Sequence, residues 1–142
     1  MHVEEILRTK GRAVYTVEAT QTLAEAIALL NKHNIGAAVV LDAGGDIAGI
    51  LSERDIVRRM SGDLASLRAT PVGDCMTAKP KTCALRDTVD EVMKVMTGGR
   101  FRHLPVAENG KLIGLVSIGD VVKRKIELAE EEAARLRDYI AS

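Results

Sequence analysis

An internal repeat constrains this chain more than any other feature of its sequence. Residues 47–59 align with residues 112–124 at a constant offset of 65, so that Asp55 matches Asp120. Upstream the offset becomes 66, and the change falls in a glycine-containing turn, where a true structural repeat tolerates a change in length. A copy of ~55 residues buries too little surface to be stable alone, so the two copies are expected to pack together as one body.

Each copy shows the same order of predicted elements. Thr22 and Thr88 are expected to be helix N-caps, because each is followed by a glutamate three residues later, as in a capping box. The apolar residues of the following helices recur at the 3.6-residue period, and the strands are apolar almost throughout, which is typical of strands buried on both faces. The expected elements are an extended segment (14–17; 81–83), a helix (23–32; 89–97), two strands joined by a glycine turn (37–41 and 47–51; 101–106 and 112–116) and a second helix beginning at Ser52 or Ser117.

The fold class that follows is α/β (α+β), with two pseudo-symmetric β-α-β-β-α units packed through their sheets as one module. The expected boundaries are 8–62 for the first unit, 63–74 for a connector, 75–131 for the second unit and 126–142 for a C-terminal helix. This helix carries an apolar stripe, which is expected to pack on its own body or on a second subunit. The stripe consists of Ile126, Ala129, Ala133, Leu136 and Ile140.

Charge and composition narrow the range of functions. Twenty Lys and Arg balance twenty Asp and Glu, and aromatic residues make up only 2%, so neither a positive field nor stacking platforms for nucleic acid are expected. No apolar run approaches the ~20 residues that cross a bilayer, and residues 1–10 lack the apolar core of a signal peptide. We therefore predict a soluble cytoplasmic protein that binds neither nucleic acid nor membrane, with Cys75 and Cys83 as reduced, packed thiols.

The sequence shows no pattern of catalytic residues. Its three histidines lie far apart, and no spacing typical of a zinc site, an EF-hand or a P-loop is present. Acidic residues are numerous but scattered over helix faces. We therefore expect neither catalysis nor a metal or catalytic cofactor, and an enzyme is the least favoured of the function classes.

The repeated motif resembles that of a known family. Each copy ends in the pattern Gly-hydrophobic-hydrophobic-Ser-x-x-Asp, and each leading segment contains a threonine, Thr16 or Thr82. The second copy also contains the run Arg102-His103-Leu104-Pro105-Val106. These features resemble the cystathionine β-synthase (CBS) domain, and two copies in tandem look like the pair known as a Bateman module. The resemblance covers residues 3–124.

The resemblance implies a regulatory role. Tandem CBS pairs form two pseudo-symmetric clefts that take adenosine ligands, and they assemble as disc-shaped homodimers. The ligand expected here is AMP, with ADP, ATP, NAD(H) and S-adenosylmethionine as alternatives, and the signal would pass to a separate protein. A ligand-free dimerisation or interaction module is the other alternative. The implied ligand-binding residues are Thr16, Gly36, Ala37, Ser52, Arg54, Asp55, Thr82, Phe101, Arg102, His103, Pro105, Ser117, Gly119 and Asp120.

The chemistry of these residues supports the implied roles. An ionised carboxylate accepts both hydroxyl protons of a ribose diol, which makes Asp55 and Asp120 the candidates, one in each cleft. Ser52 and Ser117 are placed where helices begin, and there free N–H groups and the helix dipole favour phosphate. The alternative for the two aspartates is an N-terminal capping role without a ligand.

The two clefts are expected to differ. The cleft of Asp55 would include the segment 101–105, where arginine and a protonated histidine can bind phosphate oxygens, so we expect it to hold a charged phosphate best. Arg54 stands beside Asp55, whereas the matched residue of the second copy is a glycine. The other cleft, which would include Thr16 and Gly36, is expected to be roomier and less charged.

Overall fold

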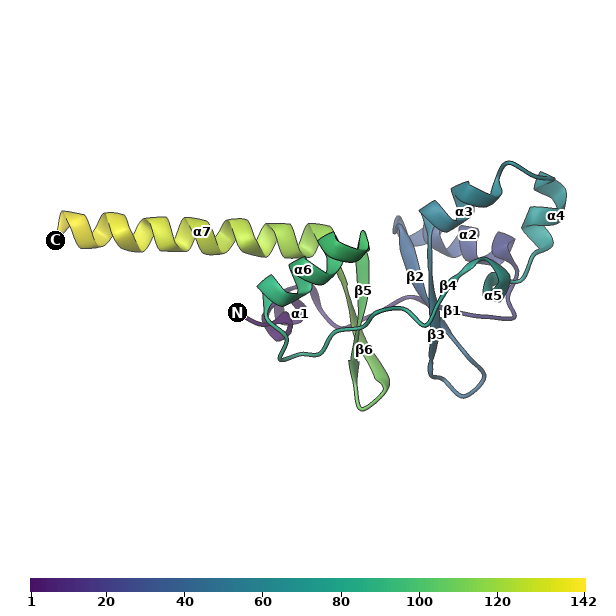
Figure 1. The fold of residues 1–142 in the computed structure, drawn as a ribbon, viewed down its shortest axis with the longest axis horizontal. Coiled ribbons are helices and arrows are strands. Elements are labelled where there is room, and N and C mark those ends of the chain that lie inside the picture. Colours follow the sequence, from purple (N-terminus) through teal and green to yellow (C-terminus); the bar gives the residue numbers. More distant parts are fainter.

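The computed structural model describes residues 1–142 and shows two units side by side, with their sheets in the middle and their helices outside (Figure 1). The first unit contains β1 (Thr16–Glu18), α2 (Leu23–His33), β2 (Ala37–Leu41), β3 (Ile47–Ser52) and α3 (Glu53–Arg59). The second contains α6 (Val89–Gly99), β5 (His103–Glu108), β6 (Lys111–Ser117) and α7 (Ile118–Ala141). The remaining elements are α1 (Val3–Lys10), α4 (Leu64–Ala69), α5 (Val72–Cys75) and β4 (Thr77–Ala78).

Strand pairing follows the repeat. In the first unit β1 is parallel to β2, β2 is antiparallel to β3, and β4 joins the edge of β3. In the second unit β5 is antiparallel to β6, and a single parallel bridge from Cys83 to Val106 takes the place of β1. The extended segment predicted at 81–83 is therefore reduced to one bridged residue. The chain before this segment belongs to the other sheet, because β4 pairs with β3 of the first unit.

The second helix of each unit begins with a reciprocal capping box. Ser52 accepts a hydrogen bond from the Asp55 N–H, and the Asp55 side chain accepts one from the Ser52 N–H. The matched residues of the second unit repeat this arrangement at the start of α7. The capping boxes predicted at Thr22 and Thr88 are only half formed, because each threonine accepts from the backbone N–H three residues on without a bond in the reverse direction.

The short helices that precede the two units are exchanged between them. α1 precedes the first unit, yet its residues Val3, Ile6 and Leu7 belong to the apolar core of the second. α5 precedes the second unit, yet Val72 and Cys75 belong to the core of the first. Each core is thus completed by a segment that lies next to the other unit in the sequence, which ties the two units into one body.

Matched hydrogen bonds fix this exchange. The Val72 N–H donates to the Gln21 carbonyl (2.8 Å), and the Val3 N–H donates to the matched carbonyl of Asp87 (2.9 Å). Each packed segment also lies against a glycine of the repeat, at a distance that any larger side chain would overlap. The exchange therefore follows the pseudo-symmetry of the chain.

The facing surfaces of the two sheets are buried between the units. Ala37 and Val39 of β2 lie outside the apolar core of their own unit, yet they are 3% and 0% exposed. Because successive strand residues point to opposite faces, these side chains face the second unit. Pro105 of β5 is buried as well, and an ion pair between Asp46 and Lys111 (3.3 Å) joins the two hairpin turns. The predicted packing of the units through their sheets is confirmed.

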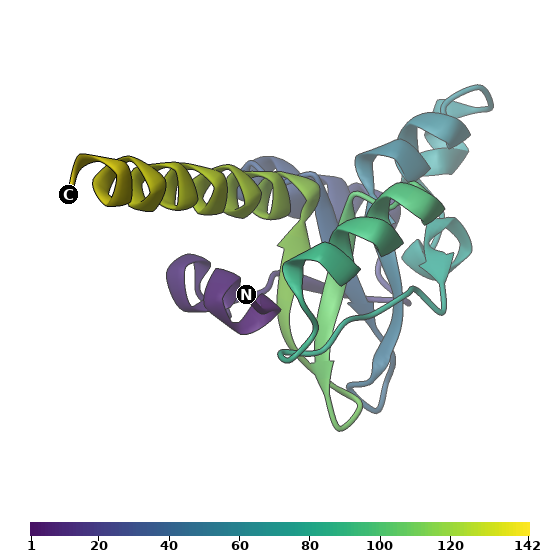
Figure 2. The same cartoon turned by 60° about the vertical axis from the view of Figure 1, so that its left-hand side comes forward.

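The structure adds detail to two segments outside the units, whose boundaries stay predictions. The predicted connector contains a helix, α4, whose N-cap Asp63 accepts from the Ala65 N–H (3.0 Å). The C-terminal helix predicted from residue 126 onward continues the last helix of the second unit without a break. α7 therefore runs over 24 residues and projects from the body (Figure 2).

Both cysteines are free and buried, as predicted. Burial raises the pKa of Cys83 to about 12, and burial also raises the pKa of Cys75. The two thiols are therefore protonated at neutral pH, and they act as small apolar side chains of the two cores.

Candidate functional site

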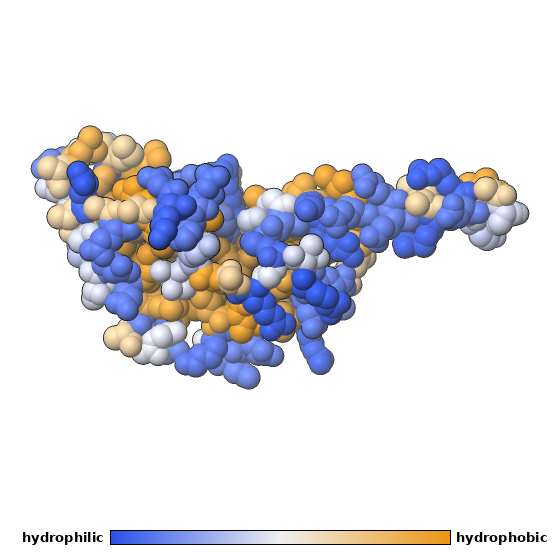
Figure 3. Space-filling view, turned by 180° about the vertical axis from the view of Figure 1, so that it is seen from behind, coloured by the Kyte–Doolittle hydropathy of each residue, from blue (hydrophilic) through white to orange (hydrophobic).

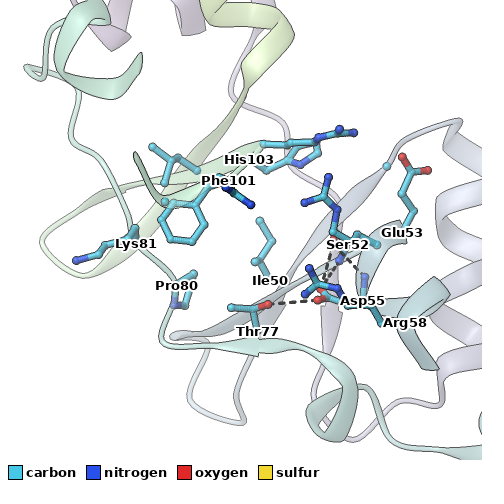
Figure 4. A pocket seen from close by; sticks show the side chains of 16 residues that line it. Ile50, Ser52, Glu53, Asp55, Arg58, Thr77, Pro80, Lys81, Phe101 and His103 are labelled. Atoms are coloured by element: carbon cyan, nitrogen blue, oxygen red, sulfur yellow. Dashed lines mark hydrogen bonds between the residues drawn. The ribbon is translucent and has the colours of Figure 1, made fainter. Parts of the chain in front are cut away.

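A cleft of about 420 Å³ opens between the two units (Figure 4). Its walls come from the end of β3 and the start of α3, from the segment that follows β4, and from the turn between α6 and β5. We refer to it as the Asp55 cleft. Its lining residues are Gly36, Ile50, Ser52, Glu53, Arg54, Asp55, Arg58, Thr77, Pro80, Lys81, Gly99, Arg100, Phe101, Arg102, His103 and Leu104.

Asp55 is held at the edge of this cleft by hydrogen bonds to both carboxylate oxygens. Its Oδ2 accepts from the Ser52 N–H (2.9 Å) and from the Ser52 hydroxyl (3.1 Å). Its Oδ1 accepts from the Thr77 hydroxyl (3.3 Å), which β4 supplies. A carboxylate has about four lone-pair sites, so Oδ1 retains capacity for another donor. Asp55 can therefore accept a hydrogen bond from a ligand without losing the bonds that position it.

Positive charge surrounds this carboxylate. Five lining residues are cationic and two are acidic, so the cleft carries a net positive charge. Figure 4 shows Arg58 beside Asp55, one helical turn further along α3. Guanidinium groups bind phosphate oxygens in a bidentate manner, which makes this wall suited to an anion with several oxygens. The cations come from both units and the segment between them: Arg54, Arg58, Lys81, Arg100 and Arg102.

An apolar surface lies beside the charged wall. The side chains of Ile50, Pro80 and Phe101 approach one another in the cleft (Figure 4). The Phe101 ring lies against Gly99, where any side chain would overlap it. A flat aromatic ring and a proline together form a surface on which a planar base can stack. The cleft thus combines an anchored carboxylate, several cations and an apolar slot.

His103 lies at the junction of the two units. Its burial lowers its pKa, and the positive charge of Lys10 lowers it further, while Asp120 and Glu53 act in the opposite direction. The imidazole is therefore neutral at pH 7 and offers one donor and one acceptor. A bound anion would favour the protonated form, so His103 can respond to the charge of a ligand in the cleft.

Asp120, which matches Asp55 in the repeat, forms an ion pair with a lysine of the same chain. The Lys10 ammonium donates to Asp120 Oδ2 (2.6 Å) and to the Leu115 carbonyl (2.8 Å). Burial opposes ionisation of Asp120, but the bonds from Lys10 and Ser117 outweigh it and hold the pKa below its usual value. The pocket beside Asp120, about 220 Å³, is lined by residues of α1 and α7 alone.

An aromatic pair occupies two positions that match lining residues of the Asp55 cleft in the repeat. The rings of Tyr15 and His33 stack with their centroids 3.7 Å apart and their planes 15° from parallel. The residues that match them in the second copy, Lys81 and Gly99, line the Asp55 cleft. The two positions that line the open Asp55 cleft in the second copy of the repeat therefore carry stacked rings in the first copy.

Half of the predicted site residues meet in the Asp55 cleft: Gly36, Ser52, Arg54, Asp55, Phe101, Arg102 and His103. Gly36 was expected in the other cleft. It lies near Asp55 because its carbonyl accepts from the Glu53 N–H (2.9 Å), which places the start of β2 beside the start of α3. Outside this cleft are exposed Thr16 and Thr82, buried Ala37 and Pro105, and Ser117, Gly119 and Asp120 at the start of α7.

Sequence reasoning missed several lining residues, among them Arg58, Thr77, Lys81 and Arg100. Arg100 had a detectable signal. It ends α6 in the left-handed conformation (φ 58°), at the position where Asn34 ends α2. Asparagine and glycine favour this conformation, so an arginine at the position that matches Asn34 is unusual and points to a role for its charge.

The chain belongs to the CBS-domain family, because a model of the CBS domain matches residues 3–62 and 72–127. Among the relatives is CBSX3, a mitochondrial CBS domain-containing protein of Arabidopsis thaliana, which is 35% identical over 97% of this chain and 71% of that protein. The crystal structure of the CBS-domain containing protein ATU1752 from Agrobacterium tumefaciens is 46% identical. It superposes with a TM-score of 0.83 over 87% of this chain and 92% of that one.

Two more distant structures share the fold and contain ligands. CBSX2 in complex with AMP superposes with a TM-score of 0.69 at 23% identity, over 82% of this chain and 90% of that one. The CBS domain pair of MJ0100, in complex with 5'-methylthioadenosine and S-adenosyl-L-methionine, superposes with a TM-score of 0.76 at 23% identity, over 87% and 94%. No helix of the present chain has both the length and the apolar character to cross a membrane. The cytoplasmic location stays a prediction.

Proposed function

We propose that this chain is a non-catalytic regulatory module that binds an adenine nucleotide, AMP in the first place, in the Asp55 cleft and signals to a separate protein. The observation that carries the proposal is the combination, in one cleft between two units, of an anchored carboxylate, five cations and an apolar slot. The carboxylate suits a ribose diol, the slot suits the base and the cations suit a phosphate. Each ligand named for the two distant structures contains adenosine, which supports this ligand class.

The charge of the cleft favours a nucleotide over other adenosine compounds. S-adenosylmethionine carries a sulfonium cation next to its ribose, and a wall that contains Arg54, Arg58 and Arg102 repels such a charge. NAD(H) has the required phosphates but adds a second nucleoside. The cleft, at about 420 Å³, lies toward the lower end of the 300–1,000 Å³ typical of ligand sites, so a mononucleotide is preferred.

We further propose that one nucleotide binds per chain. The carboxylate of Asp120 is already paired with Lys10, and a ligand there would have to displace an ammonium at 2.6 Å. Tyr15 and His33 fill the matched wall by stacking on each other. These contacts favour the Asp55 cleft as the working site.

The proposed signal follows from the position of the ligand. Asp55 and Ser52 belong to the first unit, whereas Arg102 and His103 belong to the second, so a nucleotide would contact both. A ligand can shift an equilibrium between two arrangements only through its difference in affinity for them. A bridging nucleotide satisfies this condition, because it contacts both units only when they are suitably placed. No covalent step is part of the role.

Isothermal titration calorimetry of the full chain with AMP tests the proposal. We expect one AMP per chain, and we expect Asp55→Asn to weaken binding roughly 10- to 100-fold, because hydrogen bonds to a charged group contribute about 1.5–3 kcal/mol. The matched control is Asp120→Asn, which changes the same kind of helix cap. It should leave the affinity within about twofold, because Asp120 does not line the Asp55 cleft. Titrations with ADP, ATP, NADH and S-adenosylmethionine rank the alternatives.

Three results would contradict parts of the proposal. A folded protein that binds none of these compounds would favour the ligand-free interaction module. Two AMP molecules per chain, or equal losses in the two variants, would show that the Asp120 side is also a working site. Tighter binding of S-adenosylmethionine than of AMP would assign a different role to the cations.

A further inference from the structure

His103 lines the Asp55 cleft and also lies next to the start of α7. It pairs with Ser117 across the hairpin of β5 and β6. Directly opposite residues of an antiparallel pair have their side chains on the same face, with Cβ atoms about 4.5–5.5 Å apart. The Ser117 N–H donates to the Asp120 carboxylate (2.9 Å). The imidazole that lines the cleft is therefore a neighbour of the carboxylate that binds Lys10.

Charged groups from four parts of the fold act on this imidazole. Burial lowers the pKa of His103 most, and the cations Lys10 of α1 and Arg102, just before β5, lower it further. Asp120 of α7 and Glu53 of α3 raise it. Lys10 and Asp120 are paired with each other at 2.6 Å. The state of this one ion pair therefore sets much of the charge that His103 meets on the side away from the cleft.

Lys10 occupies a place that β4 fills in the first unit. Its ammonium donates to the Leu115 carbonyl (2.8 Å) as well as to Asp120. The residue that matches Leu115 is Ile50, which pairs with Thr77 of β4. The residues that follow Lys10 form no matching strand with β6. One side chain thus takes the place of a paired strand at this edge of β6, and it can leave without breaking a backbone hydrogen bond.

The ion pair of Lys10 and Asp120 is also open to water. The two side chains are 38% and 24% exposed. Figure 3 shows hydrophilic residues over α1, beneath the start of the projecting helix, and the exposed residues of α1 are all polar. Separating the pair therefore uncovers no apolar surface, and water can solvate both charges. Such a pair is weak enough for a neighbouring charge to change its state.

We propose that a nucleotide in the Asp55 cleft weakens the pairing of Lys10 with Asp120, and that His103 carries this effect from the cleft to the pair. The inference rests on the proposed nucleotide binding and concerns its regulation. A bound phosphate favours the charged imidazole, which takes up its proton from the solvent. The charged imidazole repels the Lys10 ammonium and attracts the Asp120 carboxylate, so the pair opens and the end of α1 is released.

The coupling predicts an effect of unusual sign. Coupling between two sites is reciprocal, so the closed pair must in turn weaken nucleotide binding. Removing a cation near an anion site ordinarily weakens anion binding, because the positive potential falls. Removing Lys10 should instead strengthen AMP binding, since the imidazole is then protonated more readily. The sign of the change therefore separates a relay through His103 from a general effect of charge.

Nuclear magnetic resonance titration of His103 in the nucleotide-free chain tests the link to Lys10. The signal of this histidine is identified by its loss in His103→Asn. We expect Lys10→Met to raise the pKa of His103 by about 0.5–1. The matched control Arg8→Met removes a cation from the same helix, where Arg8 pairs with Glu4 (3.8 Å), and should leave the pKa of His103 unchanged. An unchanged pKa in Lys10→Met, or equal changes in the two variants, would overturn the proposal.

Calorimetric titration with AMP at pH 6.5 tests the link to the cleft. We expect Lys10→Met to bind AMP about two- to threefold more tightly than the wild type, because more of its His103 is protonated in the complex. The same substitution in a His103→Asn chain should bring no gain, and neither should Arg8→Met. Weaker binding by Lys10→Met, or equal gains with and without His103, would overturn the proposal. If no chain binds AMP while the pKa of His103 rises in Lys10→Met, the proposed function fails and the link between Lys10 and His103 stands.

Discussion

The two units of this chain carry an aspartate at the same place in the same fold, yet only Asp55 faces an open cleft between the units. Five residues that line the Asp55 cleft are cationic, whereas the five residues that match them in the other copy of the repeat include only one cation. The pairs are Arg54 and Gly119, Arg58 and Lys123, Lys81 and Tyr15, Arg100 and Asn34, and Arg102 and Gly36. The repeated backbone thus fixes where the carboxylate lies, and the side chains that are not repeated decide what can reach it.

The difference at the aspartates themselves begins in the exchanged helices. α5 ends at Cys75, and the chain then becomes extended as β4 and presents the Thr77 hydroxyl to Asp55. α1 is twice as long and ends at Gly11, whose φ of 98° suits glycine, so its last residue, Lys10, reaches Asp120. One aspartate therefore receives a neutral donor that leaves its charge available, and the other receives a cation that neutralises it.

Removing the phosphate-binding charge of the second unit should have the largest effect. We expect Arg102→Ala to weaken AMP binding roughly 10- to 100-fold, since a charge-assisted hydrogen bond contributes about 1.5–3 kcal/mol. Adenosine, which has no phosphate, should be bound almost as well as by the wild type. Calorimetric titration with both ligands measures the ratio of affinities, and the control Lys123→Ala, on the Asp120 side, should change neither. An equal loss for adenosine would place Arg102 at the base or the ribose.

The repeat made much of this comparison predictable from the sequence. Offsets of 65 and 66 identified the paired hairpins and paired Asp55 with Asp120, and the Ser-x-x-Asp spacing placed both carboxylates in the first turn of a helix. Such features are local, because caps and turns depend on residues only a few positions apart. The same locality explains why the richer charge around Asp55 could be anticipated.

The contacts that make Asp55 and Asp120 differ were not predictable, because they join distant parts of the chain. Lys10 and Asp120 are 110 residues apart, and an apolar residue pattern shows that α1 must pack without showing on which unit. The two threonines of the leading segments were expected at the ligand and are exposed outside the cleft. Lys81, the neighbour of Thr82, lines the cleft in place of the threonine, because the segment after β4 crosses between the units.

The pH dependence of binding should report on His103. Burial holds its pKa below the usual value, so the free protein has a neutral imidazole at pH 7, whereas a bound phosphate would raise the pKa. A higher pKa in the complex means that binding takes up a proton, so affinity should rise as the pH falls toward and below about 6.5. Because AMP itself titrates near pH 6, the quantity to measure is the ratio of wild-type to His103→Asn affinity. We expect this ratio to increase about three- to tenfold from pH 8 to pH 5.5. A constant ratio would remove His103 from the phosphate site.

Exchanging one matched pair should separate stability from binding. Arg100 adopts a left-handed conformation that asparagine tolerates better, so Arg100→Asn should raise the free energy of unfolding by about 0.5–1 kcal/mol. The same change removes a cation from the cleft and should weaken AMP binding a few-fold. The reverse change, Asn34→Arg, should destabilise the chain without improving binding. Urea unfolding and calorimetry measure the two effects, and an Arg100→Asn variant with unchanged affinity would show that the arginine does not contact the nucleotide.

The smallest effect is expected from the ion pair of Lys10 and Asp120, which is partly exposed. Lys10→Met should lower the free energy of unfolding at pH 7 by at most about 1 kcal/mol. The pKa of Asp120 is depressed in the folded chain, so the stability it contributes is present above the pKa of the unfolded chain and is lost as the pH falls through the folded value. The difference between wild type and variant in urea should therefore shrink below about pH 4. A difference that does not depend on pH would mean that packing of the lysine, not its charge, stabilises this region.

The same variant also tests how many nucleotides bind. Because Tyr15 and His33 still stack on each other, Lys10→Met should bind one AMP per chain. A second bound AMP would identify Lys10 as the sole barrier to binding beside Asp120.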